Sequence, residues 1–263
     1  MSVWEKFEID STDYLNRVFN KYAHFDCRGG SNSTVSDIEV MTNSGRHFYI
    51  EAKHCPAQCG QFVLLPNVGE RRFEYSRQNA TLLNPYSESI IKHMNSRFDE
   101  YKEAGTAGKP IEMENGSSIF AAWIVQAYRD KGAEFIITNG NIIIPVDDFS
   151  NSFYISAKYR VKRSGSNSVG SGRMDAVSEY LESNFSLMSV QRSGDKLFVT
   201  SDSYLHNRRF VIAGTEYMIS GRGERYEIRR LSNTFNANVI FSIELKECIR
   251  GLSYEEFASF LKQ

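Results

Sequence analysis

The chain has few of the features that mark exported, membrane-bound or disulfide-stapled proteins. Its 263 residues include 4 cysteines, too few for a disulfide framework at this length. No run of about 18 apolar residues occurs, so we expect no membrane-spanning helix. The first residues lack the apolar core of a signal peptide, which favours a cytoplasmic protein. Cys55 and Cys59 flank no second Cys or His pair, so we expect buried small residues there and not zinc ligands.

The chain also lacks a strong excess of either charge. The formal net charge is −1, and the hydrophobic content of 41% and charged content of 24% are typical of a globular protein. The charge is divided unevenly, however. Residues 1–150 hold 15 Lys and Arg against 20 Asp and Glu, whereas residues 151–263 hold 16 against 12. A basic second half favours contact with a polyanion such as nucleic acid.

The most informative segment spans residues 36–53 and predicts a β-hairpin. Two alternating runs are joined by a turn that ends at Gly45, a common three-residue hairpin connection. The register then pairs Ile38 with Ile50 and Val40 with Phe48 on one apolar face. The other face carries charged residues, namely Asp37 opposite Glu51, with Lys53 two residues further on.

The charged face of this hairpin has the residue types of a metal-dependent phosphodiesterase. Directly opposed residues have Cβ atoms about 5 Å apart, so Asp37 and Glu51 can share one divalent cation. Carboxylates suit Mg²⁺, which lowers the pKa of a bound water and stabilises charge on a phosphate. Lys53 can orient or deprotonate that water, or neutralise the phosphate. The alternative interpretation is the ordinary wet face of a surface hairpin.

These residues, an Asp followed by Glu-x-Lys on the next strand, resemble the signature of the PD-(D/E)XK nuclease superfamily. The sequence has Ser36 where the family name has Pro. A closer resemblance, to the HhaI restriction endonuclease family, rests on four blocks that span most of the chain and is weakest over residues 167–228. The blocks are Trp4 with Phe7-Glu8 and residues 14–16, residues 48–53 with 58–64 and 66–67, residues 159–162 with 164–166, and residues 231–242.

This resemblance implies an α/β fold with a restriction-endonuclease-like core, in which a central mixed sheet is flanked by helices, and a strand-rich C-terminal half. It implies Asp37, Glu51 and Lys53 as catalytic residues and Asp37, Glu51 and Ala52 as metal-binding residues, with Mg²⁺ as cofactor. Three more residues are expected to support the site, namely Glu8, Gln58 and Gln61. An exposed helix carboxylate for Glu8, and a loop or capping role for the two glutamines, are the alternatives.

The resemblance further implies a bacterial type II restriction endonuclease that cuts both strands of double-stranded DNA at a short palindromic site, with GCGC as the predicted site. A cognate DNA methyltransferase is then expected as a genetic and not a physical partner. Two alternatives stay open. One is a structure-selective repair or recombination nuclease of the same superfamily, and the other is a non-catalytic DNA-binding module, against which the intact Asp, Glu and Lys set argues.

Two basic or polar segments are the predicted DNA contacts. Cations alternating with Tyr159 and Val161 on a strand suit phosphates or guanine edges. The predicted contacts are Lys158, Arg160, Lys162 and Arg163, followed by Asn233, Asn236 and Asn238. A solvated strand face is the alternative for the cations, and a core strand with asparagines in its turn is the alternative for the second segment.

The coarse order of elements completes the prediction. We expect a helix over residues 3–22, a loop over 66–83, a helix opened by Asn84-Pro85, and a helix capped by Ser117 or Ser118 that ends near Gly132. Residues 135–144 predict a hairpin, residues 187–245 several strands, and Ser253 with Glu256 a capping box. We expect residues 1–263 to form a single cooperative unit, with 1–150 mainly catalytic and 151–263 mainly for DNA recognition.

Overall fold

The structure is a computed structural model that describes residues 2–29, 36–163, 166–231 and 235–263, with the backbone alone described for Arg163, Phe235 and Asn236. The chain forms two compact units. Unit 1 comprises Met1–Arg160 and Ala237–Gln263, and unit 2 comprises Val161–Asn236. The chain therefore leaves unit 1 once and returns to it. The predicted cooperativity of the two parts stays a prediction. Within the described ranges no helix is long and apolar enough to cross a membrane.

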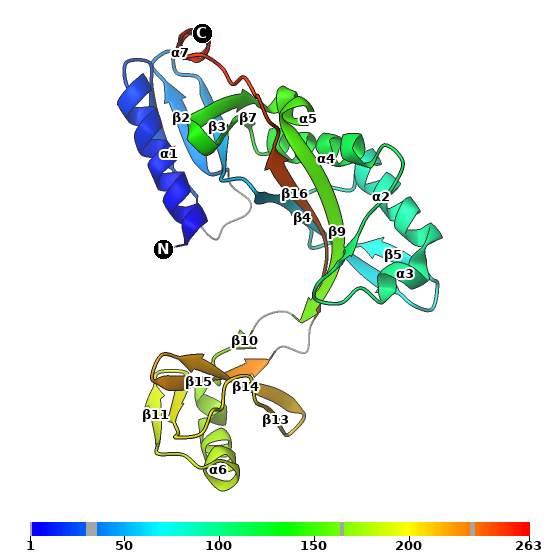
Figure 1. The fold of residues 1–263 in the computed structure, drawn as a ribbon, viewed down its shortest axis with the longest axis vertical. Helices are drawn as coiled ribbons and strands as arrows, with labels where there is room; N and C mark the ends of the chain where they lie inside the picture. Colours follow the sequence, from blue (N-terminus) through cyan, green and yellow to red (C-terminus); the bar gives the residue numbers. More distant parts are fainter. Residues whose placement is uncertain (1, 30–35, 164–165, 232–234) are drawn as a thin grey trace. The chain divides into compact units, whose positions relative to one another are not determined.

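Unit 1 is built on a mixed five-stranded sheet with the order β1-β2-β3-β7-β8 (Figure 1). β3 is its central strand, antiparallel to β2 and parallel to β7. The predicted register of the first hairpin is confirmed, because Ile38 pairs with Ile50 and Val40 with Phe48. The strands are β1 (Ala23–Cys27), β2 (Ile38–Thr42), β3 (His47–Lys53), β7 (Ala133–Thr138) and β8 (Ile142–Pro145).

Helices cover both faces of this sheet, as predicted. The apolar face of the hairpin packs against α1 (Val3–Phe19) and α7 (Tyr254–Leu261), whose Leu15, Phe257 and Leu261 are fully buried. α4 (Gly116–Asp130) is the helix that leads into β7 and packs against it. The Ser253–Glu256 capping box that opens α7 is present. The predicted α/β fold is confirmed.

A second sheet continues unit 1, in the order β5-β4-β16-β9-β6. β4 and β16 are its long antiparallel neighbours, with Phe62 opposite Val239. Asn84 caps α2 as predicted, with Pro85 in the first turn. The elements are β4 (Ala57–Asn67), β5 (Arg72–Tyr75), α2 (Pro85–Ser96), α3 (Phe98–Lys102), β6 (Lys109–Pro110), α5 (Phe149–Ser152), β9 (Phe153–Arg163) and β16 (Phe235–Leu245), with short 3₁₀ helices at Asn139–Asn141 and Val146–Asp148.

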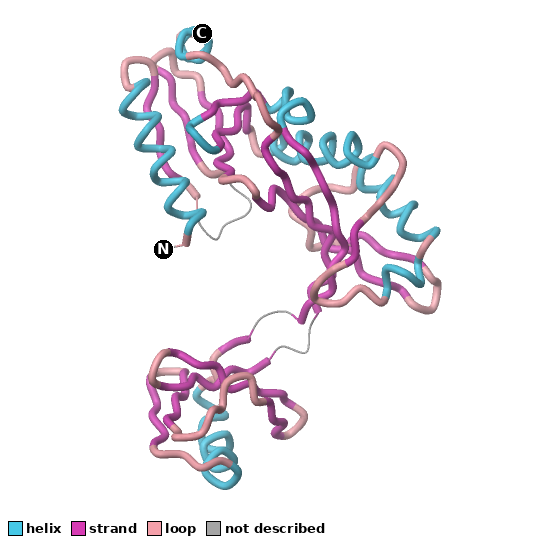
Figure 2. The backbone as a smooth tube through the Cα atoms, in the orientation of Figure 1, coloured by secondary structure: helices cyan, strands magenta, loops and turns pink. Residues whose placement is uncertain are grey.

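Unit 2 is a small antiparallel sheet with one helix, α6 (Met174–Asn184), packed on it (Figure 2). Its core joins Val177 and Leu181 of α6 to Leu197, Ile219 and Ile228 of the sheet. The other elements are β10 (Ser166–Asn167), a 3₁₀ helix at Ser171–Arg173, β11 (Ser189–Ser193), β12 (Lys196–Thr200), β13 (Arg209–Ile212), β14 (Thr215–Arg222) and β15 (Arg225–Leu231).

Some local expectations were wrong. The predicted loop over 66–83 contains β5, which pairs with β4 and buries only Phe73. The alternation of Phe73 and Tyr75 over four residues, with only Phe73 buried, is too short to predict a strand. The cap of α4 is Asn115, in the left-handed conformation with φ 54°, and not Ser117 or Ser118. The helix therefore begins at Gly116, where a Cβ would lie 3.1 Å from the Met113 side chain.

Candidate active site

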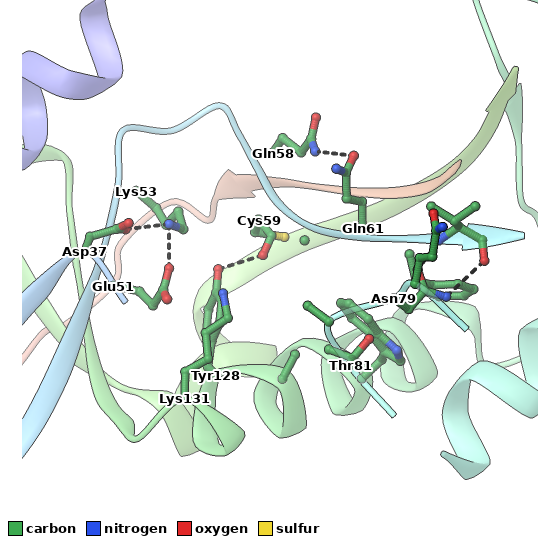
Figure 3. A pocket seen from close by; sticks show the side chains of 17 residues that line it. Asp37, Glu51, Lys53, Gln58, Cys59, Gln61, Asn79, Thr81, Tyr128 and Lys131 are labelled. Atoms are coloured by element: carbon green, nitrogen blue, oxygen red, sulfur yellow. Dashed lines mark hydrogen bonds and ion pairs between the residues drawn. The ribbon is translucent and has the colours of Figure 1, made fainter. Parts of the chain in front are cut away.

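The carboxyl end of the central strand brings Asp37, Glu51 and Lys53 together. Asp37 directly precedes β2, Glu51 lies within β3, and Lys53 is the last residue of β3. The Nζ of Lys53 lies 2.7 Å from Oδ2 of Asp37 and 2.6 Å from Oε2 of Glu51 (Figure 3). The backbone N–H of Ala52 donates to the same Oδ2 of Asp37 at 2.8 Å. One ammonium therefore bridges two carboxylates.

This cluster is largely withdrawn from water. Glu51 is 3% exposed, and the side chains of Asp37 and Lys53 are 15% and 14% exposed. Burial raises the pKa of Asp37, more than Lys53 lowers it. Burial also pushes the pKa of Glu51 upward, but Lys53 and Lys131 together outweigh that effect and leave the pKa lowered.

Lys53 keeps its proton in this arrangement. Burial alone would lower the pKa of Lys53, but the two carboxylates outweigh burial and raise the pKa above its ordinary value. The ring of Tyr128 lies under the ammonium, with its centroid 5.9 Å from Nζ. An ammonium held between two carboxylates can stabilise negative charge on a phosphate, and the choice between this role and that of a base stays a prediction.

The donor set fits a hard divalent cation. Oε1 of Glu51 is buried and has no hydrogen-bond partner within the described ranges, an orphaned anionic oxygen that a cation would satisfy. Ala52 has only its backbone to offer. Because the N–H and C=O of one strand residue point to the same side, its carbonyl faces the side of Asp37. Over the described part of the chain, no group of three or more His, Cys, Asp or Glu residues forms a closed metal cage. Two carboxylates and a carbonyl leave room for waters, which Mg²⁺ retains.

Glu8 reaches the same cluster from α1. It is 7% exposed, and its Oε2 lies so close to the backbone of Gly29 that a Cβ there would be 2.0 Å away. Burial, followed by the negative charge of Asp37, raises the pKa of Glu8 to about 7. The exposed-carboxylate alternative is therefore wrong, because this side chain is buried beside the predicted metal residues.

Gln58 and Gln61 lie beside the cluster, and their side chains are exposed to solvent. Both side chains are exposed on β4, and Nε2 of Gln58 donates to Oε1 of Gln61 at 3.1 Å. They line the mouth of a cavity of about 380 Å³ that also takes in Asp37, Glu51 and Lys53. Their predicted supporting role stays a prediction.

The cavity contains residues that the sequence did not point to. Its far wall is α4, which contributes Trp123 and Tyr128, together with Lys131 directly after the helix. The hydroxyl of Tyr128 donates to the Cys59 carbonyl at 2.9 Å, and Nε1 of Trp123 is a buried donor with no partner among the described residues. The other wall residues include Gln78, Asn79, Ala80 and Thr81. These residues reach the site through long-range packing, of α4 on β7 and β4 and of Asn79 on Val63, which leaves no local signal in the sequence.

The predicted DNA contacts lie elsewhere, and none whose side chain is described lines this cavity. Lys158 and Arg160 lie on the unit 1 part of β9, and Lys162 and Arg163 on its unit 2 part. Asn238 is 8% exposed on β16, opposite Val63. Asn236 belongs to the same strand, and Asn233 lies outside the described residues. Their role stays a prediction.

Two cysteines and two histidines flank the cluster in sequence. Cys55 and Cys59 are buried, as predicted for small residues beside β3. His54 packs its ring edge-on against Phe7, with centroids 5.2 Å apart, and the imidazole of His47 lies 2.6 Å from Glu39. Neither histidine has a position among the cavity-lining residues.

Comparison with known proteins identifies one close relationship. No protein-family model and no curated protein matches the chain. A solved structure of the HhaI endonuclease in complex with DNA matches it with 37% sequence identity and a TM-score of 0.77. The match covers 99% of this chain and 98% of that chain. With this identity over the whole length, and with the same fold, the chain belongs to the HhaI endonuclease family.

Proposed function

We propose that the protein is a Mg²⁺-dependent type II restriction endonuclease that hydrolyses both strands of double-stranded DNA at a short palindromic site. One observation carries the proposal: Asp37, Glu51 and Lys53 form a buried charged cluster, with an orphaned carboxylate oxygen, in a member of this endonuclease family. The HhaI structure is a complex with DNA, which supports the substrate class.

Each residue of the cluster has a role that follows from its surroundings. Asp37, Glu51 and the Ala52 carbonyl would hold the cation, which when bound activates a water and stabilises charge on the phosphate. Lys53 stays protonated and neutralises charge on the reacting phosphate. Glu8 keeps its carboxyl beside Asp37 and accepts or holds a proton there near neutral pH. The assignment to the PD-(D/E)XK superfamily rests on the same residues.

DNA binding would use both units. Unit 1 holds 20 Lys and Arg against 24 Asp and Glu, whereas unit 2 holds 11 against 8. In unit 1, Arg160 has a buried Nε without a partner among the described residues, so its guanidinium is uncommitted. An uncommitted arginine on a strand beside Lys158 and Lys162 supports a contact with phosphate or guanine. Residues 1–150 would then be mainly catalytic and 151–263 mainly for DNA recognition.

The proposed site is GCGC, by likeness to the HhaI family, and a plasmid digest tests it. Discrete fragments whose sequenced ends share one palindrome, formed with Mg²⁺ and absent with EDTA, are the expected result. Smearing, or cutting of branched DNA alone, would instead support the structure-selective nuclease. Binding without any cutting by the wild type would support the non-catalytic module. In the first case, a cognate methyltransferase in the same bacterial cytoplasm is the expected genetic partner.

A further inference from the structure

Lys131 is a second cation on the wall of the active-site cavity, and its backbone is held on both sides. It follows α4 directly, and its N–H donates to the Tyr128 carbonyl at 3.1 Å. The next residue is Gly132, with φ 77°, where a Cβ would lie 3.2 Å from the ring of Tyr49. The Gly132 carbonyl accepts from the Tyr49 N–H at 3.0 Å, which ties this turn to β3. The backbone that carries the Lys131 side chain is therefore fixed relative to Glu51, which lies two residues after Tyr49 in β3.

The side chain of Lys131 is half-buried and points into the cavity. Figure 3 shows it beside Tyr128, among the side chains that line the cavity. Yet Lys131 has no ion pair or hydrogen bond from its amino group within the described ranges, whereas Lys53 is already engaged by both carboxylates.

The charge balance of the cavity indicates what this uncommitted ammonium binds. The two carboxylates, Asp37 and Glu51, are already paired with Lys53 and would also hold the proposed Mg²⁺. A DNA phosphodiester entering the cavity adds another negative charge. A lysine ammonium is a compact point charge with three donors, well suited to a non-bridging phosphate oxygen. Lys131 is the cavity-lining cation that is free to make that contact, among the residues whose side chains are described.

We propose that Lys131 binds a non-bridging oxygen of the DNA backbone phosphate that enters the cavity beside Glu51. This inference rests on the proposed function for its substrate class and extends it by one residue. Lys131 would hold the phosphate from the α4 side while Lys53 faces it from β3. The two cations would thus fix the position of the phosphate relative to the carboxylates.

Lys131→Met tests the proposal, because methionine keeps a long side chain without charge. A charge-assisted hydrogen bond is worth roughly 1.5–3 kcal/mol, so kcat/KM for plasmid cleavage should fall by about tenfold to a hundredfold. The slope of log Kd against log salt, measured without metal, should become shallower by about 0.9. Lys131→Arg should retain the salt slope, because it keeps the charge.

Lys21→Met is the matched control. Lys21 also lies just beyond a helix C-terminus, two residues after α1 ends, but it is exposed and does not line the cavity. It should retain the wild-type kcat/KM and salt slope. Thermal unfolding of all three variants verifies that they are folded.

A neutral phosphate makes the test specific. Duplexes with one methylphosphonate, scanned across the cleavage position, should bind wild type more weakly at one position and lose that penalty with Lys131→Met. The same penalty in both proteins would overturn the proposal, as would a Lys131→Met variant that only needs more Mg²⁺ while its salt slope is unchanged. If the wild type does not cut at all, the proposed function fails. The salt dependence of DNA binding without metal still shows whether Lys131 contacts a phosphate.

Discussion

Replacing Lys53 by methionine should reveal the cost of burying two carboxylates side by side. The ammonium of Lys53 lies 2.6 Å from Glu51 and 2.7 Å from Asp37, and all three side chains are at most 15% exposed. Lys53→Met keeps most of the side-chain volume and removes the charge. Asp37 and Glu51 then face each other without the cation between them.

The size of the effect can be worked from these distances. At an effective dielectric constant of about 20, each contact carries roughly 6 kcal/mol of Coulomb attraction. Desolvation of the three groups offsets most of this attraction, and protonation of one carboxyl limits the loss when the lysine is removed. Breaking a buried ion pair from one side typically costs about 3–5 kcal/mol. We expect that loss in EDTA, which corresponds to a melting temperature lower by about 6–20 °C.

A divalent cation should restore much of this stability. Ca²⁺ takes the same oxygen ligands as Mg²⁺, so it should stabilise Lys53→Met more than wild type, in which the ammonium already occupies the carboxylate pair. The assay is thermal unfolding in EDTA and in a Ca²⁺ titration. The double variant Lys53→Met with Glu51→Gln is the control, since it removes one of the opposed charges and should recover stability in EDTA. An equal gap between wild type and Lys53→Met in EDTA and in Ca²⁺ would refute the reasoning.

Three other predictions concern catalysis, recognition and pH. Asp37→Asn and Glu51→Gln should each slow cleavage by at least about 10²–10³-fold while DNA binding survives or tightens, as measured by gel cleavage and by titration of labelled duplex. Alanine in place of a residue that reads a base should weaken binding of the cognate duplex only, by about 1–3 kcal/mol, whereas loss of a phosphate contact should weaken binding of all duplexes alike. Alanine variants of Arg160, Lys162 and Arg163, tested on cognate and one-base-changed duplexes at two salt concentrations, separate the two classes. Glu227 is 5% exposed; burial alone would raise its pKa, but hydrogen bonds from Arg229 and Arg222 outweigh burial and lower it. The contribution of Glu227 to folding stability is therefore complete above the unfolded pKa near 4.5 and is lost as pH falls through the lower folded pKa. Glu227→Gln should lower the free energy of unfolding by roughly 1–3 kcal/mol at pH 7 and by less at pH 3, whereas the exposed control Glu224→Gln should not.

The hairpin could be predicted because the information is local. Alternation of apolar residues and a turn ending at Gly45 fix the register, and that register places Asp37 next to Glu51. Helix starts followed the same logic where the cap was a side chain, as at Asn84 and Ser253. The start of α4 did not, because Asn115 caps it from a left-handed backbone without a side-chain hydrogen bond, whereas the prediction looked for a capping serine.

Residues that reach the site through distant pairing could not be predicted. Glu51 lies opposite Ile136 in a parallel pair, 85 positions apart in sequence, and the packing of α4 beside that pair carries Tyr128 and Lys131 to the cavity. A parallel pair has no turn to set its register, and a buried run such as residues 133–138 fits either side of several strands. α6 was missed for a similar reason: its buried residues meet partners from strands that follow it in the chain.

The charged cluster is better explained by function than by stability. A buried ion pair is often no more stabilising than well-packed apolar residues of similar volume. Here Glu51 and Lys53 of the central strand and Asp37 beside it form a charged cluster on a sheet whose other face is an apolar core. Glu8 adds a third carboxyl, with a raised pKa, to the same place. Every one of these groups conflicts with the requirements of a stable core, and every one suits a site that must bind a cation and a phosphate. The local conflict therefore identifies the carboxyl end of β3 as the part of the fold retained for chemistry.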